Sequence, residues 1–131
     1  MDVFGSSGVR GVVNEGFTPT FVHRIALAAG STLDAPAVAL ARDTRHTGRM
    51  FADAAGAGIA ATGTDVHRLG IVPTPGVQAY AETHGVPALV VTASHNPPAY
   101  NGVKLIGADG VELSRGELER IEGRLLAEKF D

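Results

Sequence analysis

The chain has 131 residues, of which 44% are hydrophobic and 19% charged, with a net charge of -3 and no cysteine. That length suffices for one domain with its own core and is short for two. The mild negative charge gives no reason to expect nucleic acid or an anionic membrane as a partner. Without cysteine there are neither disulfides nor thiolate metal sites. Because no apolar run approaches the about 20 residues of a membrane span, we expect a cytoplasmic protein that does not enter a membrane.

The chain begins with a glycine-rich segment, Phe4-Gly5-Ser6-Ser7-Gly8-Val9-Arg10-Gly11. The spacing of its glycines matches neither the dinucleotide-binding pattern nor the Walker A pattern, so it does not indicate a nucleotide site. From spacing alone we interpret it as a turn that leads into a short strand at residues 12–13.

Apolar strand patterns then alternate with amphipathic helix patterns. We expect helices at 18–30, 48–61, 74–85 and 114–125, and strands at 37–41, 64–72, 88–91 and 103–106. Thr18 and Thr74, each followed by proline, are typical helix N-caps, and Ser114 with Glu117 forms a capping box. Gly63 and Gly85 are suited to left-handed helix ends. This order predicts a single α/β domain over residues 1–131, a three-layer α/β/α sandwich around a mixed sheet of about four main strands.

A polar segment, Arg42-Asp43-Thr44-Arg45, follows the strand at 37–41. One interpretation is an arginine–aspartate pair on the surface together with a helix cap. The other is direct contact with a substrate, and the sequence leaves both open.

The candidate nucleophile is Ser94, which comes just after the buried strand at 88–91. Ligands of open α/β sheets bind outside the carboxyl ends of the strands, so this hydroxyl is well placed for chemistry. Pro97 and Pro98 stiffen the loop that follows because each fixes φ and lacks an N–H. Lys104 stands in an otherwise apolar strand and needs an anionic partner or a route to solvent. A phosphoryl group on Ser94 would be such a partner.

Two other classes of function compete with phosphoryl transfer. A serine hydrolase would use Ser94 as nucleophile and His95 as base, but the sequence lacks Gly-x-Ser-x-Gly, and adjacent side chains seldom point at each other. The remaining alternative is a non-enzymatic domain that keeps the fold, or a catalytically incomplete part of a larger enzyme.

Two motifs carry a family resemblance. Thr92-Ala93-Ser94-His95-Asn96-Pro97, followed by Tyr100-Asn101-Gly102-Val103-Lys104, resembles the phosphoserine loop of the α-D-phosphohexomutases. The segment from Phe4 to Gly11 resembles that family's amino-terminal motif, with Ser6 in place of threonine. The polar segment at 42–45 resembles its Gly-x-Asp-x-Arg sequence, with Ala41 in place of glycine. The resemblance covers nearly the whole chain, but only the first domain of the family.

The resemblance implies a phosphoglucomutase or phosphomannomutase activity, in which phosphoserine at Ser94 moves phosphate between C1 and C6 of a hexose. Arg10 and Lys104 would supply positive charge, and Lys104 or His95 would assist proton transfer. The resemblance further implies that Ser7, Asn96 and Asn101 contact the substrate or its phosphate. They would do so beside the catalytic residues Ser94, Lys104, Arg10 and His95.

The family also implies partners and cofactors. Magnesium (Mg2+) would bind one oxygen of the Ser94 phosphate, with its other ligands in an Asp-Gly-Asp-x-Asp-Arg loop that this sequence lacks. Hexose 1,6-bisphosphate would act as activator, a phosphosugar as substrate, and domains II–IV would complete the active site. Ser7 and Tyr100 favour glucose or mannose phosphate over the glucosamine type. We therefore expect the chain alone to fold and to be inactive as a mutase.

Overall fold

The computed structural model describes residues 4, 8–93 and 96–127. In chain order its elements are β1 (Val9–Val12), α1 (Pro19–Leu33), β2 (Ala37–Arg42), α2 (Gly48–Ala61), β3 (Asp65–Ile71), α3 (Thr74–His84), β4 (Ala88–Val91), β5 (Tyr100–Ile106) and α4 (Arg115–Ala127). Among these described helices, none is long and apolar enough to cross a membrane.

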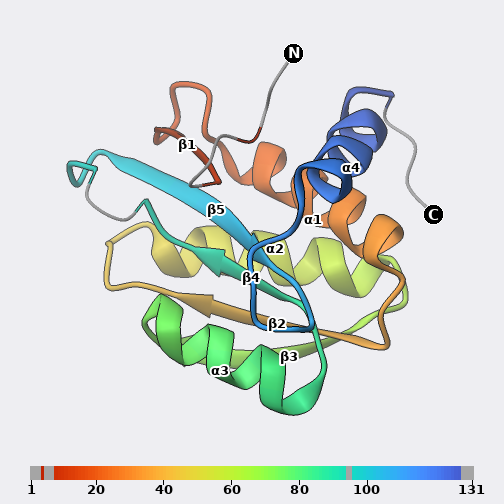
Figure 1. Cartoon of the computed structure of the whole chain (residues 1–131). Coiled ribbons are helices and arrows are strands. Elements are labelled where there is room, and N and C mark those ends of the chain that lie inside the picture. Colours follow the sequence, from red (N-terminus) through yellow and green to blue (C-terminus); the bar gives the residue numbers. More distant parts are fainter. Residues whose placement is uncertain (1–3, 5–7, 94–95, 128–131) are drawn as a thin grey trace.

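The described strands form one mixed, five-stranded sheet in the order β1-β5-β4-β2-β3. β2 runs parallel to both β3 and β4, whereas β5 runs antiparallel to both β4 and β1. Helices α1, α2 and α4 cover one face of the sheet and α3 covers the other (Figure 1). The predicted three-layer α/β/α sandwich is therefore confirmed.

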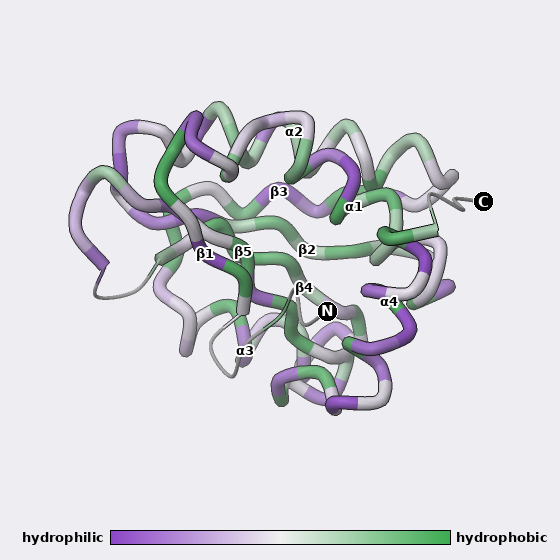
Figure 2. The backbone as a smooth tube through the Cα atoms, turned by 90° about the horizontal axis from the view of Figure 1, so that it is seen from above, coloured by the Kyte–Doolittle hydropathy of each residue, from purple (hydrophilic) through white to green (hydrophobic). Residues whose placement is uncertain are grey.

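Each layer of helices closes its own hydrophobic core. The larger core joins Ile25 of α1, Phe51 of α2 and Ile121 of α4 to one face of the sheet. The smaller core packs Val77 and other residues of α3 against the opposite face. The central strands β2 and β4 are mostly hydrophobic, whereas the helices change character from turn to turn (Figure 2). Parallel strands covered on both faces require such continuous apolar runs.

The predicted helix ends are largely confirmed. The Thr18 hydroxyl accepts a hydrogen bond from the Phe21 amide at 3.1 Å. The capping box is present, since Ser114 Oγ accepts from the Glu117 amide, and Glu117 Oε1 accepts from the Ser114 amide, each at 3.2 Å. Gly63 and Gly85 have φ of 81° and 64°, in the left-handed region that glycine enters without strain.

Several boundaries differ from the prediction, and β5 begins at Tyr100 rather than at residue 103. β1 begins at Val9 rather than at residue 12, because residues 9–12 all pair with β5, and it ends before the turn at Asn14, whose φ is 63°. α1 continues past Gly30 to Leu33; a Cβ at Gly30 would lie 2.5 Å from Thr62 Oγ1, so glycine here permits close packing of α1 on the end of α2. The expectation that Thr74 caps α3 is wrong, because Pro73 occupies the N-cap and Thr74 is already helical.

Candidate functional site

The candidate site is built around the loop that joins β4 to β5. Its start is held by the Thr92 amide, which donates to the Gly102 carbonyl at 2.9 Å, and its end by the Tyr100 amide, which donates to the Pro97 carbonyl at 2.9 Å. Three of the predicted site residues lie outside the described residues: Ser7, Ser94 and His95. Their roles stay predictions.

Arg10 reaches this loop from β1. The antiparallel pairing of β1 with β5 sets Arg10 opposite Gly102. Arg10 Nη1 donates to Asn96 Oδ1 at 2.7 Å. A Cβ at Gly102 would lie 2.9 Å from Arg10 Cγ, so the missing side chain leaves room for the arginine stem. The structure thus brings together two of the predicted site residues, one from each motif.

Arg45 holds the same loop from the other side. Its Nη2 donates to the Asn96 carbonyl at 2.7 Å, and its Nη1 donates to the Pro97 and Tyr100 carbonyls at 2.8 and 3.2 Å. Only 13% of the Arg45 side chain is exposed. The predicted arginine–aspartate pair is present, but its arginine is not an exposed surface residue, because Arg45 is largely covered by the loop that it binds.

Asp43 connects Arg45 to the first residue of the loop. Asp43 Oδ2 accepts from Thr92 Oγ1 at 2.8 Å and forms an ion pair with Arg45 Nε at 3.4 Å. Asp43 Oδ1 also accepts from the Arg45 amide at 3.2 Å. Residue spacing could not reveal the contact with Thr92, because it lies 49 residues away from Asp43 in the sequence. The only sequence signal was the resemblance of residues 42–45 to a family motif.

Lys104 has an anionic partner that the sequence analysis did not identify. Its Nζ lies 2.7 Å from Glu112 Oε1, with 19% of the lysine side chain and 44% of the glutamate side chain exposed. Glu112 reaches it because residues 106 and 112 form an isolated antiparallel bridge across the turn after β5. The contact of Lys104 with a phosphoryl group stays a prediction.

Asn101 is fully buried and packed between two segments. Its Nδ2 donates to Thr47 Oγ1 at 3.0 Å, and its Oδ1 accepts from the Gly102 amide at 2.8 Å. These bonds tie the start of β5 to the residue before α2. Its proposed contact with substrate stays a prediction, and the observed bonds give it a structural role.

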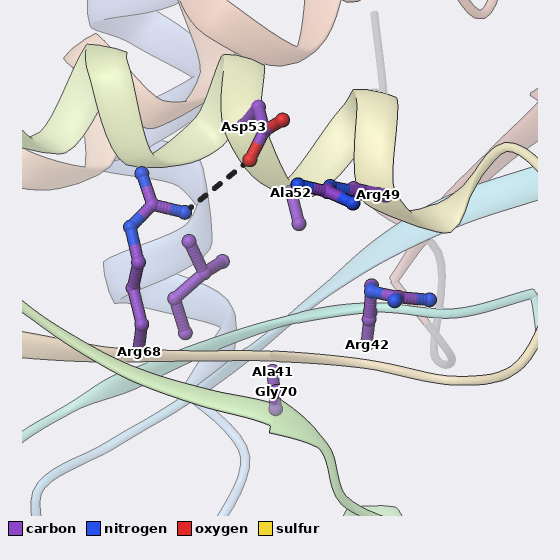
Figure 3. Close-up of a pocket in the computed structure, with 8 residues that line it drawn as sticks. Ala41, Arg42, Arg49, Ala52, Asp53, Arg68 and Gly70 are labelled. Carbon is purple, nitrogen blue, oxygen red and sulfur yellow. Dashed lines mark ion pairs between the residues drawn. The ribbon is translucent and has the colours of Figure 1, made fainter.

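Two cavities lie near the carboxyl end of β2. One of about 520 Å³ borders the loop and is lined by Asp43, Thr44, Arg45, His46, Asn96 and Pro98. The other, of about 200 Å³, lies between α2 and strands β2 and β3, where Arg42, Arg49 and Arg68 face it together with Asp53 (Figure 3). Arg68 Nη1 is 3.5 Å from Asp53 Oδ1. The larger cavity is the one that adjoins the candidate nucleophile's loop.

The described residues do not form a metal site by themselves. Across residues 4, 8–93 and 96–127, no group of three or more His, Asp or Glu side chains could hold an ion. Asp43, the carboxylate nearest the loop in the contacts above, is already occupied by Arg45 and Thr92. We therefore derive no step through magnesium.

Comparison with known proteins shows which family shares this fold and these motifs. The family model for phosphoglucomutase/phosphomannomutase, alpha/beta/alpha domain I, matches residues 1–131. A phosphoglucomutase/phosphomannomutase of Thermococcus kodakarensis is 42% identical over 98% of this chain, and a phosphoglucosamine mutase of Thermosipho africanus is 40% identical over all of it. A putative phosphomannomutase of Thermus thermophilus superposes with a TM-score of 0.86 at 34% identity over 98% of this chain. The chain belongs to the phosphoglucomutase/phosphomannomutase family and corresponds to its α/β/α domain I.

The match covers a minority of each relative. The chain spans 29% of the Thermococcus protein, 30% of the Thermosipho protein and 30% of the Thermus structure. A family structure from Burkholderia thailandensis, with a TM-score of 0.87 and 30% identity, is covered to 31%. The relatives therefore contain further sequence beyond the part that this chain matches.

Proposed function

We propose that this chain is the phosphoserine-bearing domain of a phosphohexomutase that reversibly moves phosphate between C1 and C6 of a hexose. The observation that carries the proposal is the hydrogen bond from Arg10 to Asn96, because it joins the two family motifs within one site. An arginine beside the loop suits phosphoryl chemistry, since its planar guanidinium can bind two phosphate oxygens at once.

The reaction would proceed in two transfers. A sugar hydroxyl attacks phosphorus as the bond from phosphorus to the Ser94 oxygen breaks, and the hydroxyl proton is transferred to the departing Ser94 oxygen, with His95 or Lys104 relaying it. The resulting hexose 1,6-bisphosphate then presents its other phosphate, which the Ser94 oxygen takes back as the proton returns to the sugar. Arg10 and Lys104 would offset the negative charge of the group in transit, since such transfers depend chiefly on positioning and charge stabilisation.

The proposed substrate is a glucose or mannose phosphate, with hexose 1,6-bisphosphate as activator. Magnesium would neutralise charge on the phosphoserine, with its remaining ligands supplied from outside this chain. Domains II–IV would contribute those ligands and bind the sugar and its second phosphate. Because the relatives include phosphoglucosamine mutases, glucosamine phosphate belongs in every substrate test.

The decisive experiment compares Ser94→Ala with Ser114→Ala in the full-length protein. Ser114 caps α4, so its loss should lower stability slightly and leave turnover unchanged. Ser94→Ala should abolish mutase turnover and the mass increase of a phosphoryl group while keeping the melting temperature. Wild-type turnover in Ser94→Ala would overturn the proposal. Serine-dependent hydrolysis of simple esters would favour the hydrolase instead.

The chain alone provides a second test. We expect it to give no turnover of glucose 1-phosphate, mannose 1-phosphate or glucosamine 1-phosphate with magnesium and a bisphosphate activator. Activity restored by adding the remaining domains in trans would support the proposal that this domain carries the phosphoserine and that the other domains supply the metal ligands and bind the sugar. Turnover by the 131-residue chain alone would contradict it.

A further inference from the structure

The Arg45 guanidinium is enclosed by the chain on the far side of the candidate site's loop. Four of its N–H groups, out of the five that an arginine carries, donate to Asp43 and to the carbonyls of Asn96, Pro97 and Tyr100. Only 13% of the Arg45 side chain is exposed, so these acceptors replace most of the water that would otherwise hydrate its guanidinium. An arginine remains charged in this setting, so the acceptors are required to offset its desolvation.

Asp43 fixes the opposite end of the same segment. Its Oδ2 accepts from the hydroxyl of Thr92, and its backbone amide donates to the Val91 carbonyl at 3.1 Å. Thr92 is itself 8% exposed. The loop is therefore attached at both ends to the short segment that follows β2, through Thr92 at its start and through residues 96–100 at its end.

The loop depends on side chains for this attachment. Pro97 and Pro98 have no amide hydrogen, so the middle of the segment cannot donate backbone hydrogen bonds to a neighbouring strand. The carbonyls of Asn96, Pro97 and Tyr100 accept instead from one guanidinium, whose planar fork reaches several acceptors simultaneously, while the Ala99 carbonyl accepts from the Val13 amide at 2.9 Å. A lysine carries its three donors on a single nitrogen and cannot span the same set of carbonyls.

We propose that Arg45 and Asp43 are positioning residues, which hold Thr92 and residues 96–100, the described parts of the loop that flank the candidate nucleophile in sequence, in the geometry that phosphoryl transfer requires. The inference rests on the proposed mutase function and adds to it two residues that act through the loop, Arg45 through backbone carbonyls and Asp43 through the Thr92 hydroxyl. Small misplacements of a reacting group can cost about 100-fold in rate. Loss of the attachment should therefore lower kcat while leaving KM for the hexose phosphate nearly unchanged.

The first experiment measures the loop without reference to activity. Hydrogen–deuterium exchange of the peptide spanning 92–101 is compared in the purified chain and its Arg45→Lys and Asp43→Asn variants. Arg49→Lys is the matched control, because Arg49 lines the smaller cavity between α2 and the sheet. We expect this peptide to exchange at least 10-fold faster in the two loop variants than in the wild type. In the Arg49→Lys control its exchange rate should equal that of the wild type. Unchanged exchange in Arg45→Lys would overturn the proposed attachment, even if the enzyme were an active mutase.

The second experiment measures kinetics of the same variants in the full-length protein. We expect Arg45→Lys to lower kcat about 10- to 100-fold with KM within about 3-fold, and Arg49→Lys to match the wild type. Wild-type kcat in Arg45→Lys would show that a positive charge alone suffices and would overturn the positioning role. A higher KM with unchanged kcat would overturn it too. If the wild type itself has no turnover, the mutase proposal fails, while the exchange data still decide whether Arg45 holds the loop.

Discussion

Arg10 Nη1 and Asn96 Oδ1 share a 2.7 Å hydrogen bond across 86 residues of sequence. The bond is possible because β5 returns antiparallel to both β4 and β1, which sets Arg10 opposite Gly102. The glycine-rich segment and the loop after β4 thereby meet at one place in the sheet. A phosphate bound there would find a guanidinium already oriented by Asn96.

Replacing Arg10 by methionine should slow the proposed transfer without unfolding the domain. Methionine keeps much of the apolar stem that crosses Gly102 but donates no hydrogen bonds. Loss of one donor to a developing negative charge typically lowers kcat about 100-fold or more, and we expect that range in the full-length protein. Arg49→Met serves as control and should keep wild-type turnover. Equal rates for Arg10→Met and the wild type would exclude a role for Arg10 at the phosphate.

Much of the fold could be predicted from local patterns. Strands β2 and β4 are buried on both faces and therefore show uninterrupted apolar runs, while helix caps such as Thr18 and Ser114 involve neighbours in sequence. The order of the strands could not be derived in this way. It depends on which apolar faces pack together, and no local pattern encodes that choice.

The site was less predictable than the fold. The position of Ser94 after a buried strand and the rarity of a lysine in an apolar strand indicate Ser94 and Lys104, and the family resemblance adds Arg10. The contacts of Arg45 and Glu112 could not be predicted, because their partners are backbone carbonyls or residues across a turn. Side chains that bind backbone atoms leave no complementary residue in the sequence to indicate them.

Gly102 is a position where a single methyl group should destabilise the fold. A Cβ there would lie 2.5 Å from the Val9 carbonyl oxygen and 2.7 Å from the Thr92 carbonyl oxygen, and both are backbone atoms that cannot rotate away. Gly102→Ala must therefore displace β1 or the end of β4. We expect a loss of about 1–3 kcal/mol in the free energy of unfolding, measured by urea denaturation of the chain. Unchanged stability would mean that the two strands have room to separate.

At Gly123, substitution by alanine should stabilise the fold rather than destabilise it. It lies inside α4, and a Cβ built on it meets no heavy atom within 4 Å. Alanine in a helix interior is more favourable than glycine by about 0.5–1 kcal/mol, because glycine loses more backbone entropy on folding. Gly123→Ala should raise the free energy of unfolding by that amount in the same urea experiment. A decrease would indicate that α4 packs more tightly at this residue than the structure shows.

The last prediction separates the two possible roles of Lys104. Its 2.7 Å ion pair with Glu112 is partly exposed to solvent, at 19% and 44% for the two side chains. Such a pair contributes about 0–1 kcal/mol to stability, so Glu112→Gln should change the free energy of unfolding by no more than that. Lys104→Met keeps most of the lysine's apolar stem and removes its charge.

We therefore expect Lys104→Met to unfold within about 1 kcal/mol of the wild type, since the pair it removes is weak. In the full-length protein it should nevertheless lose most of its mutase turnover, because the proposed mechanism uses Lys104 both for its charge and for proton transfer at the phosphate. Glu112→Gln removes the same ion pair and retains the lysine, which makes it the matched control and should leave turnover largely intact. Equal losses of turnover in the two variants would assign Lys104 a structural role through Glu112 rather than a catalytic one.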